Sequence, residues 1–499
     1  MPDILEQIVS ARRADYRQKG ATFGVAVPDH RKRPLVPFLR EPGTILEIKR
    51  ASPSRGDIAP DLDPVTLAGH YREAGTKNIS ILTEERFFKG SLNDFLAVSD
   101  RIYDVALLRK DFILYEDEID VSWRAGADAV LLIARILETE TLLRLAQRCR
   151  SFSMTPLIEV RESADLDKLS AAAAGGPVIA GVNSRDLATF QIDPLVPAIM
   201  RRKLPGTSVF ESGATTPGAC QFARRLGFEG LLIGEAAARS PENAGRLVSA
   251  FSSARPDWAG QFWREMGQRL QAAREKGRPL VKVCGLTNTD DALLAAKNGA
   301  DLLGFIFAES PRKTDAATVR AIGAKISAEG YSLPGKLPLL VGVVTETESA
   351  AAREAFSLVC EGVLDAIQYH GENPGRDLPR IDRAGGDYGI GKYSVVRLGS
   401  EADLSRIDTL LENGEPRVLV DARVEGIAGG TGKTIPRNLV RKVRDHGGLW
   451  LAGGIGPANI RRYLEEFSPE LVDVSSSLES APGKKDGTLI ASFFREIAS

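Results

Sequence analysis

The stretch LEIKRASPSRG, residues 46–56, is the one around which the chain is organised. A short apolar strand here turns within a few residues into a polar loop, and side chains two apart in a strand share a face, so Glu47 and Lys49 point the same way. Ser52 and the small residues after it supply hydroxyls and backbone amides of the kind that hold a phosphate, and Pro53 stiffens the turn. Taken alone, the stretch fits a functional site or a surface strand with an ordinary ion pair.

Similar short apolar runs alternate with helical segments through the first half of the chain. The predicted strands are 45–49, 78–82, 106–109, 129–133, 157–160, 178–182, 208–211 and 230–233. Buried parallel strands read as short apolar runs, and eight right-handed βα units in about 250 residues close into a (β/α)8 barrel. An open doubly wound sheet is the alternative, but its usual glycine fingerprint after the first strand is absent.

The same alternation restarts in the second half. Residues 256–278 carry aromatic side chains among charges, which predicts a helical linker between two domains. Further strands are predicted at 280–284, 302–307, 339–344, 366–369, 393–398, 417–421, 449–452 and 471–474. We therefore expect an α/β fold with two (β/α)8 TIM barrels in one chain, at residues 1–255 and 279–499. The stretch 371–392, rich in Gly, Pro and charge, reads as a candidate long loop.

The composition is that of a globular protein with two or three domains, or two large barrels. Hydrophobic residues make up 43% of the 499 residues and charged residues 26%, and both values are ordinary. The net charge of -1 gives no reason to expect nucleic acid or an acidic membrane as a partner. The charge of any ligand must therefore be met locally.

The N-terminal residues and the cysteines indicate a soluble cytoplasmic protein. Residues 1–18 show helical apolar spacing and no signal-peptide core, which predicts a docked amphipathic helix that extends the first barrel. No apolar run approaches the roughly 20 residues that span a bilayer. The 4 cysteines and 4 histidines are scattered, so neither a disulfide framework nor a metal site is indicated. The cysteines are Cys149, Cys220, Cys284 and Cys360.

Polar residues gather at the carboxyl ends of the first set of strands, where such barrels place their active sites. They are Glu47, Lys49, Lys110, Glu159, Asn183, Arg185, Glu211 and Ser212, with Gly234 at the last strand. Three carboxylates and two lysines in one cleft shift each other's pKa values, which is how acids and bases for neutral pH are made. The ends of strands seven and eight commonly bind phosphate, so we expect a phosphate ester as substrate. For any one residue taken singly, a solvated strand end is the alternative.

In order and spacing, these motifs resemble indole-3-glycerol-phosphate synthase. The resemblance rests on Glu47-Ile48-Lys49-Arg50-Ala51-Ser52-Pro53-Ser54, Leu108-Arg109-Lys110-Asp111-Phe112, Glu159, Gly181-Val182-Asn183-Ser184-Arg185-Asp186-Leu187, Glu211-Ser212-Gly213 and Gly234-Glu235-Ala236. It covers nearly all of residues 1–255, including the helical extension. It implies ring closure of the linear ribulose-phosphate ester of anthranilate, with loss of carbon dioxide and water.

The resemblance also implies a role for each residue. Lys110 would be the general acid at the substrate carbonyl, Glu159 the partner acid/base in dehydration, and Lys49, held by Glu47, a polarising anchor. Substrate binding would fall to Asn183 and Arg185 at the anthranilate end, to Glu211 in ordering the charges, and to Ser52, Ser212, Gly213 and Gly234 at the phosphate. Cyclisation onto a carbonyl needs one proton at oxygen, and loss of water needs another. Which of the two lysines and Glu159 acts at each step stays open.

Two strand ends in the second half carry candidate acid-base groups. A lone cysteine such as Cys284 is usually a small buried hydrophobe, but at a barrel strand end its pKa can fall from about 8.5 towards neutrality. Strand six ends in Asp421, and the run GGTGKT follows at residues 429–434. A P-loop would require glycine in place of Ile427, so we expect a flexible lid or phosphate-facing loop there and no ATP site.

Over residues 280–499 the chain resembles phosphoribosylanthranilate isomerase. The motifs are Lys282-Val283-Cys284-Gly285, Gly304-Phe305-Ile306-Phe307, Ser310-Pro311-Arg312, Gln368-Tyr369-His370-Gly371, Asp421, Gly430, Gly453-Gly454 and Ser475-Ser476. An Amadori rearrangement is implied, with Asp421 as the acid on the ribose ring oxygen and Cys284 as the base at the neighbouring carbon. Arg312 would contact the anthranilate carboxylate, and Gly430, Gly453, Gly454, Ser475 and Ser476 would face the phosphate. The chain departs from the family at Tyr369, where leucine is more usual, and at residues 434–436.

The sequence thus predicts a fused two-barrel enzyme of tryptophan biosynthesis, in which the C-terminal barrel makes the substrate of the N-terminal barrel. Its partners would be small phosphorylated anthranilates, with no metal, organic cofactor, nucleic acid or membrane, and we expect a monomer. A histidine-pathway phosphate-sugar isomerase and an inactive ligand-binding barrel pair are the alternatives. The ring-closure motifs argue against the former. The joint presence of Lys110, Glu159, Cys284 and Asp421 argues against the latter.

Overall fold

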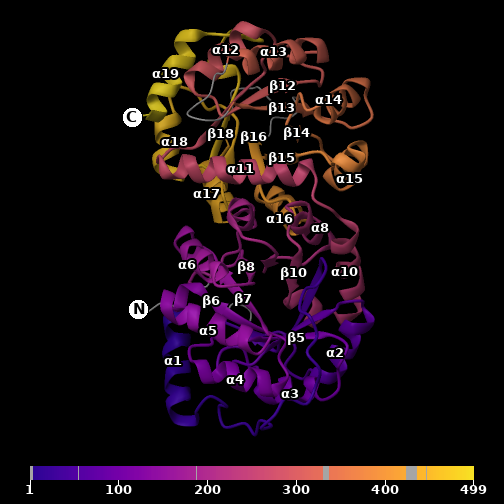
Figure 1. Ribbon diagram of the computed structural model, residues 1–499. Coiled ribbons are helices and arrows are strands. Elements are labelled where there is room, and N and C mark those ends of the chain that lie inside the picture. Colours follow the sequence, from indigo (N-terminus) through magenta and orange to yellow (C-terminus); the bar gives the residue numbers. More distant parts are fainter. Residues whose placement is uncertain are drawn as a thin grey trace. The chain divides into compact units, whose positions relative to one another are not determined.

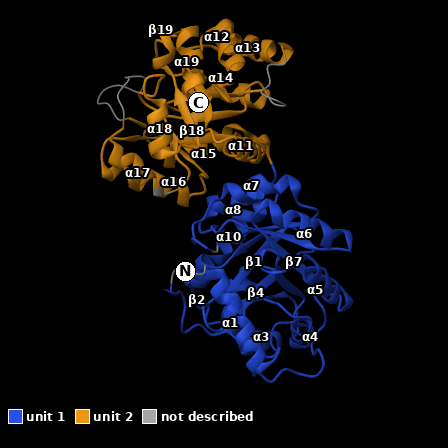
Figure 2. Cartoon of the chain, turned by 90° about the vertical axis from the view of Figure 1, so that its left-hand side faces the viewer, with its two compact units in different colours: residues 1–256 blue, residues 257–499 orange. Residues whose placement is uncertain are grey.

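The chain folds into two compact units. The computed structural model describes residues 4–53, 56–186, 188–329, 337–422, 435–445 and 447–498. The units are Met1–Pro256 and Asp257–Ser499, drawn in different colours in Figure 2. The helix predicted in the linker is α11 (Trp258–Glu275), and it lies within the second unit.

The first unit contains a closed barrel of parallel strands. The strands are β1 (Gly43–Ile48), β4 (Asn78–Leu82), β5 (Ala106–Lys110), β6 (Ala129–Ile133), β7 (Thr155–Val160), β8 (Ile179–Asn183), β9 (Ser208–Glu211) and β10 (Gly230–Ile233). Their order around the barrel is β1-β10-β9-β8-β7-β6-β5-β4, and β1 closes the ring by pairing with both β4 and β10. The predicted (β/α)8 barrel is confirmed, and the open sheet is excluded. A short hairpin follows β1, formed by β2 (Ala51–Ser52) and β3 (Gly56–Asp57).

Helices alternate with these strands and surround the barrel (Figure 1). They are α1 (Ile4–Lys19), α2 (Pro64–Glu73), α3 (Leu92–Ser99), α4 (Glu116–Ala125), α5 (Thr139–Ser151), α6 (Ser163–Ala174), α7 (Leu195–Met200), α8 (Pro217–Arg225), α9 (Glu235–Arg239) and α10 (Ala244–Ser253). Local chemistry sets where they begin. At α2, for example, the Asp63 side chain accepts from the Thr66 amide at 2.8 Å and proline occupies the first turn.

Alternation along the strands divides the barrel interior into an apolar floor and a polar mouth. The floor is one buried cluster that includes Ile45, Leu108, Leu157, Val209 and Leu232. Two residues further along each strand, and therefore on the same face, stand the side chains of the mouth. They are Glu47, Lys110, Glu159, Glu211 and, with no side chain, Gly234.

Helix α1, the predicted N-terminal extension, is joined to the barrel by apolar packing and by buried charge. Its Leu5 and Ile8 belong to the same buried cluster as the barrel floor. Its Arg12 is 3% exposed and lies 3.0 Å from Asp111, the residue after Lys110, and 3.2 Å from Glu118 on α4. Burial of a guanidinium requires such partners, so Arg12 ties the extension to the end of β5.

The second unit contains another closed parallel barrel. Its strands, in the order β11 to β18 around the ring, are β11 (Leu280–Cys284), β12 (Leu302–Ile306), β13 (Leu339–Val344), β14 (Ala366–Tyr369), β15 (Lys392–Leu398), β16 (Val418–Ala422), β17 (Trp450–Leu451) and β18 (Leu471–Val474). Its further helices are α12 (Thr289–Asn298), α13 (Ala316–Glu329), α14 (Ala350–Cys360), α15 (Pro374–Ala384), α16 (Leu404–Glu412), α17 (Arg437–Asp445), α18 (Ile460–Phe467) and α19 (Gly487–Ala498). A hairpin of β19 (Glu479–Ala481) and β20 (Lys484–Lys485) follows β18.

Helix α11 packs against the amino ends of strands in this second barrel. The ring of Trp263 stacks 5.9 Å from Trp450, the first residue of β17, and Phe262 lies 6.4 Å from Tyr393 near the start of β15. Tyr393 and Trp450 are fully buried and contact each other edge to face at 5.2 Å. The helix therefore belongs to the core of this unit.

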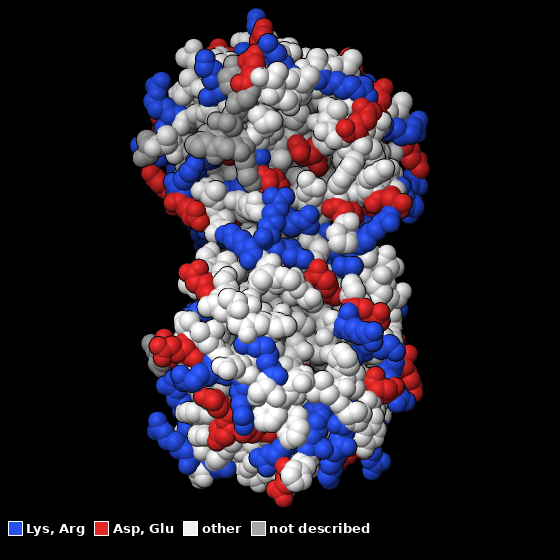
Figure 3. Space-filling model, viewed as in Figure 1, with Lys and Arg blue, Asp and Glu red and all other residues white. Residues whose placement is uncertain are grey.

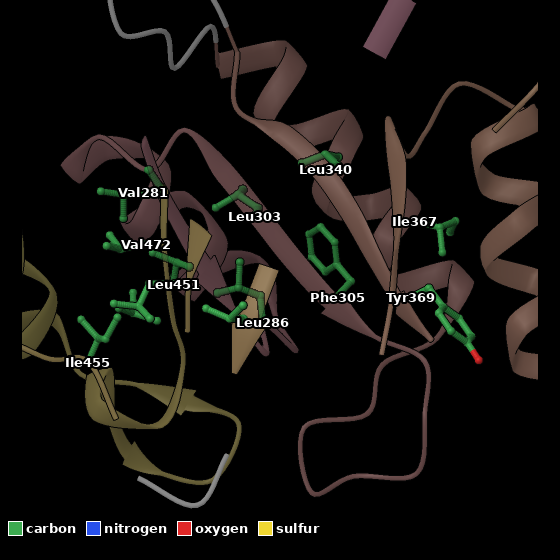
Figure 4. Close-up of a cluster of buried hydrophobic side chains, with 14 of the residues drawn as sticks. Val281, Leu286, Leu303, Phe305, Leu340, Ile367, Tyr369, Leu451, Ile455 and Val472 are labelled. Carbon is green, nitrogen blue, oxygen red and sulfur yellow. The ribbon is translucent and has the colours of Figure 1, made fainter. Parts of the chain in front are cut away.

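The stretch predicted as a candidate long loop contains a helix instead. Helix α15 begins with Pro374 in its first turn, and its Asp377 and Ile381 are buried. Asp377 accepts a hydrogen bond of 2.5 Å from the hydroxyl of Tyr369. In Figure 4 that hydroxyl points away from the apolar side chains of Phe305 and Ile367. The helix was missed because few of its residues are apolar and its main anchor is this polar contact.

The face of each unit in view carries both acidic and basic side chains, and several basic ones gather on the lower part of the second unit (Figure 3). The net charge of the chain is -1. Among the described residues, no helix has the length and apolar character needed to cross a bilayer. The sites must therefore meet substrate charge with their own residues.

Replacing Arg12 by methionine tests the buried tie between α1 and β5. We expect the Arg12→Met protein to lose about 3 kcal/mol of unfolding free energy, because Asp111 and Glu118 stay buried with one cation fewer. Urea unfolding of the full chain measures the loss. Arg13→Met, which removes an exposed arginine from the same helix, is the matched control. Equal stability of the two variants would show that the tie contributes nothing.

Candidate active sites

The first candidate site is a pocket at the carboxyl ends of β1 to β10. All but one of the residues predicted for this site line it, from Glu47 and Lys49 at β1 to Gly234 after β10. The others are Ser52, Lys110, Glu159, Asn183, Arg185, Ser212 and Gly213, with apolar walls from Leu131 and Phe112 among others. Glu211 stands behind Lys110, where its carboxylate is buried.

Lys110 is the centre of this pocket. Its Nζ lies 2.9 Å from a carboxylate oxygen of Glu211, 3.8 Å from Glu159 and 4.0 Å from Glu47. Lys49 Nζ lies 3.5 Å from the other oxygen of Glu47, and 5.5 Å from the centre of the Phe88 ring. The site thus holds three carboxylates and two ammonium groups within reach of one another.

This arrangement shifts the pKa values of the two lysines and of Glu159 in different directions. Burial alone would lower the pKa of Lys110, but Glu211, Glu47 and Glu159 together raise it, so this lysine stays protonated. The pKa of Lys49 moves the other way, because burial and the charges of Lys110 and Arg185 outweigh Glu47. Burial and the neighbouring Glu211 raise the pKa of Glu159 to about 7, against the pull of Lys110. Glu159 is therefore able to give or take a proton near neutral pH.

Two glycines make the space that these carboxylates occupy. A Cβ on Gly181 of β8 would lie 2.1 Å from Oε1 of Glu211 on the neighbouring β9. A Cβ on Gly234 would lie 2.8 Å from Oε1 of Glu47 on the neighbouring β1. Any side chain at either position would displace a carboxylate from the lysines.

The loops after β8 and β9 form the side of the pocket predicted to hold anthranilate and phosphate. The Arg185 amide donates to Asn183 Oδ1 at 3.0 Å, so these two predicted residues form one turn. After β9, Ser212 and Gly213 both adopt positive φ, 69° and 81°. Consecutive residues of this kind turn backbone N–H groups towards a common point, which suits an anion.

The second candidate site is a pocket at the carboxyl ends of β11 to β18. It is lined by Cys284 and Asp421, and by the predicted binding residues Arg312, Gly453, Gly454, Ser475 and Ser476. The loop with Gly430 lies outside the described residues. Asp421 Oδ2 is 3.6 Å from His370 Nε2, while its Oδ1 accepts from the Ala422 amide at 2.8 Å.

The acid-base groups of the second pocket also depart from their solution behaviour. Burial raises the pKa of Asp421 to about 6, and Asp473 adds to this effect. Burial lowers the pKa of His370 to about 3, so this histidine is neutral and does not stabilise the Asp421 carboxylate as a cation. Burial also raises the pKa of the Cys284 thiol, while the charge of Lys282 opposes the rise.

Several polar residues of this pocket were missed by sequence reasoning. Arg312 is held by Glu479, whose carboxylate accepts from its Nε and Nη2 at 2.9 Å each. Lys485 Nζ binds the same carboxylate at 2.9 Å and the Cys284 carbonyl oxygen at 2.7 Å. Glu479 and Lys485 come from the β19–β20 hairpin, and no spacing in the sequence relates them to Arg312.

Buried lysine and aspartate complete the floor of this pocket. Lys282 Nζ donates to Asp473 Oδ2 and to Gln368 Oε1, each at 2.7 Å. One signal was available in the sequence, since Lys282 is a charge inside an apolar strand and two residues before Cys284. No described group of three or more His, Cys, Asp or Glu residues could hold a metal ion.

Two parallel barrels, each with buried acids and bases at its mouth, define a two-site enzyme of the (β/α)8 class. Residues 6–248 match the family model described as indole-3-glycerol phosphate synthase, and residues 281–496 match that of N-(5'phosphoribosyl)anthranilate (PRA) isomerase. The indole-3-glycerol phosphate synthase of Geobacillus thermodenitrificans is 35% identical over 245 residues, 48% of this chain and 93% of that protein. The chain belongs to the indole-3-glycerol phosphate synthase family, and it carries a PRA isomerase domain in its second barrel.

Relatives that match along the whole chain combine the same parts. The multifunctional tryptophan biosynthesis protein of Schizosaccharomyces pombe is 29% identical over 99% of this chain and 66% of that protein. The tryptophan biosynthesis protein TRP1 of Phytophthora nicotianae is 28% identical over 100% of this chain and 97% of that protein. The chain thus spans just under two thirds of the length of the first of these relatives and nearly all of the second.

Gly181→Ala tests whether the Glu211 carboxylate must stand beside Lys110. Alanine is compatible with the strand, but its methyl group would meet Oε1 of Glu211, so the carboxylate must move. We expect the lyase activity of the first barrel to fall about tenfold to a hundredfold, with isomerase activity unchanged. Gly69→Ala is the control, because nothing lies within 4 Å of a Cβ there. Unchanged lyase kinetics in Gly181→Ala would contradict the geometry.

The pKa of Glu159 predicts a pH-dependent stability. Because the folded-state pKa is raised from 4.5 to about 7, the native protein binds more protons between these pH values, and stability falls as pH rises through this window. Glutamine cannot titrate, so Glu159→Gln should be more stable than the parent by roughly 3 kcal/mol above pH 7. The difference should vanish towards pH 4.5. Chemical unfolding of both proteins across this range measures it, and a difference independent of pH would refute the shift.

Proposed function

We propose that the two barrels catalyse consecutive steps. The second barrel would isomerise N-(5-phosphoribosyl)anthranilate to 1-(2-carboxyphenylamino)-1-deoxyribulose 5-phosphate. The first barrel would close this product to indole-3-glycerol phosphate, with loss of carbon dioxide and water. The observation that carries the proposal is the position of Lys110, whose ammonium is 2.9 Å, 3.8 Å and 4.0 Å from three carboxylates in one pocket.

In the first barrel we assign to Lys110 the role of general acid at the carbonyl of the linear substrate. Ring closure places negative charge on that oxygen, and a buried ammonium held in place stabilises it and supplies the proton. Glu159, with a pKa of about 7, would exchange the second proton when water leaves. Lys49 would polarise the substrate from the β1 side, with Glu47 orienting it.

The remaining predicted residues would fix the substrate. Asn183 and Arg185 form one turn at the pocket wall and would hold the anthranilate carboxylate, since a guanidinium binds this group well. Ser212 and Gly213, with Ser52 and Gly234, would hold the phosphate. Apolar side chains such as Phe112 and Leu131 line the space between, which suits an aromatic ring.

In the second barrel we assign the acid to Asp421 and the base to Cys284. They come from β16 and β11 and line the same pocket. With a pKa of about 6, Asp421 would protonate the ribose ring oxygen as the ring opens. The Cys284 thiolate would take the proton from the adjacent carbon, and the electrons of that C–H bond would form the enamine. The phosphate would be held by Gly453, Gly454, Ser475 and Ser476. We propose the same role for Gly430.

The resemblance implies that Arg312 contacts the anthranilate carboxylate, but part of its guanidinium is already bound within the protein. Its Nε and Nη2 are taken by Glu479, so only the rest of the guanidinium can meet a substrate carboxylate. We propose that Glu479 fixes the orientation in which it does so. The expected substrates are small phosphorylated anthranilates, and a monomer is the proposed state of the chain.

Separate inactivation of each barrel tests the two-site assignment. Lys110→Ala should abolish formation of indole-3-glycerol phosphate and spare isomerisation, and Asp421→Ala should do the reverse. A loss of at least about 100-fold is expected in each case, because each change removes a proton donor. Phosphoribosyl anthranilate is supplied to the full chain, and indole absorbance and the ribulose-phosphate intermediate are followed.

Lys32→Ala, at an exposed position, is the control. A mixture of the two inactive variants should restore the complete reaction, since each supplies the activity that the other lacks. If either single change removed both activities from a folded protein, the assignment would fail. Absence of any product from the parent protein would overturn the proposed function as a whole.

A further inference from the structure

Lys282 is a fully buried charge for which the reaction above has no role. Along β11, Val281 and Val283 belong to the outer apolar cluster, in which Figure 4 labels Val281. Lys282 and Cys284, on the other face of the strand, therefore both face the barrel interior. The Lys282 side chain is 0% exposed. A buried ammonium costs several kcal/mol unless it is paired, so its retention beside a proposed base calls for an explanation.

The lysine and the thiol occupy one space above Gly304. A Cβ on this glycine of the adjacent β12 would lie 2.6 Å from Cys284 Sγ and 2.9 Å from Lys282 Cε. The lysine side chain and the sulfur are therefore close neighbours inside the barrel. The positive charge of Lys282 opposes the rise that burial causes in the pKa of this thiol.

Other groups hold the ammonium in that position. Asp473 and Gln368 accept from Nζ at 2.7 Å each, and the Tyr393 hydroxyl donates to the same Gln368 oxygen at 2.9 Å. Tyr393 in turn packs against Trp450 in the floor of the barrel. The lysine is therefore fixed by two acceptors, while its side chain shares the space above Gly304 with Cys284.

We propose that Lys282 is the counterion of the Cys284 thiolate. The ammonium favours the ionised form of the sulfur, against the burial that raises the pKa of the thiol, and this form would remove the carbon-bound proton of the substrate. The S–H bond forms as the C–H bond breaks, the C–H electrons pass into the enamine, and Lys282 stays protonated throughout. Lys282 is thus a positioning and charge-stabilising residue that acts through Cys284, and this role rests on the proposed isomerase function.

The charged groups around the Cys284 thiol favour or oppose its ionised form, the thiolate. Asp473 from β18 opposes the thiolate, and so does Asp421 from β16 when it is ionised. Lys485 from β20 favours it, although its Nζ is directed to the Cys284 carbonyl and to Glu479. The phenol of Tyr393 on β15 is neutral, because burial raises its pKa. Of the two lysines, Lys282 is the one whose side chain lies beside the sulfur inside the barrel.

Two substitutions with opposite expected effects test the proposal. In Lys282→Met the thiolate loses its cation, so alkylation of Cys284 by iodoacetamide at pH 7 should slow at least about tenfold. In Asp473→Asn the lysine charge is no longer neutralised, so alkylation should accelerate severalfold. A purely structural ion pair would be broken by either change, and both would then act in the same direction.

The experiment uses the full chain without substrate. Alkylation of the peptide that contains Cys284 is followed by mass spectrometry from pH 5 to 10, which separates it from the other three cysteines. Lys392→Met is the control, because it removes a strand lysine paired with Asp382 at 2.6 Å and outside the pocket. The low-pH side of the isomerase activity profile should follow the same thiol ionisation as alkylation. In Lys282→Met both profiles should therefore shift to higher pH.

The outcomes decide the proposal in each case. Equal profiles for Lys282→Met and the parent, or shifts of the same sign in both variants, would overturn it. If Lys282→Met does not fold, Asp473→Asn alone decides, since unchanged or slower alkylation contradicts the role of Lys282. Because thiol ionisation is read without substrate, a parent protein that lacks isomerase activity would overturn the proposed function and leave this measurement standing.

Discussion

A protonated lysine can stay inside a barrel only if carboxylates surround it, and the first unit depends on this constraint. Lys110 points inward because it shares a strand face with the buried Leu108. Its charge is then offset by Glu211, Glu159 and Glu47 from three other strands. The same carboxylates are what makes the site reactive. Burial, with the neighbouring Glu211, raises the pKa of Glu159, and burial lowers that of Lys49, so the contacts that keep Lys110 buried are also those on which the proposed chemistry rests.

The second barrel meets the same constraint with different residues. Lys282 is paired with Asp473 across β11 and β18, whose strands are hydrogen-bonded neighbours. Here one carboxylate, that of Asp473, accepts from the ammonium, and the amide oxygen of Gln368 is the second acceptor. In the proposed mechanism this lysine, with two carboxylates fewer around it than Lys110, offsets part of the rise that burial causes in the pKa of the Cys284 thiol. The two barrels thus use a buried lysine to support different acid-base pairs.

The barrels and most strand-end residues could be predicted because a parallel strand is a short apolar run with a defined inner face. Alternation carries Glu47, Lys110 and Glu159 to one mouth without any knowledge of tertiary contacts. The errors lie where single polar contacts between two structural elements decide the outcome. Helix α15 was read as a candidate loop because its anchor is the bond between Asp377 and Tyr369, and the pairing of Arg312 with Glu479 spans 167 positions in the chain. Nothing in the local pattern specifies either contact.

The same steric feature is found in both sites. Each of four proposed site residues stands above a glycine that lies on the neighbouring strand or just after it: Glu211 above Gly181, Glu47 above Gly234, Cys284 above Gly304 and Asp421 above Gly453. In each pair a Cβ on the glycine would lie between 2.1 Å and 2.8 Å from the reactive atom. A closed barrel has no spare interior volume, so a long polar side chain can turn inward only where its neighbour has none. The glycines are therefore part of the proposed acid-base sites, because a side chain at any of them would displace the polar group that now turns inward.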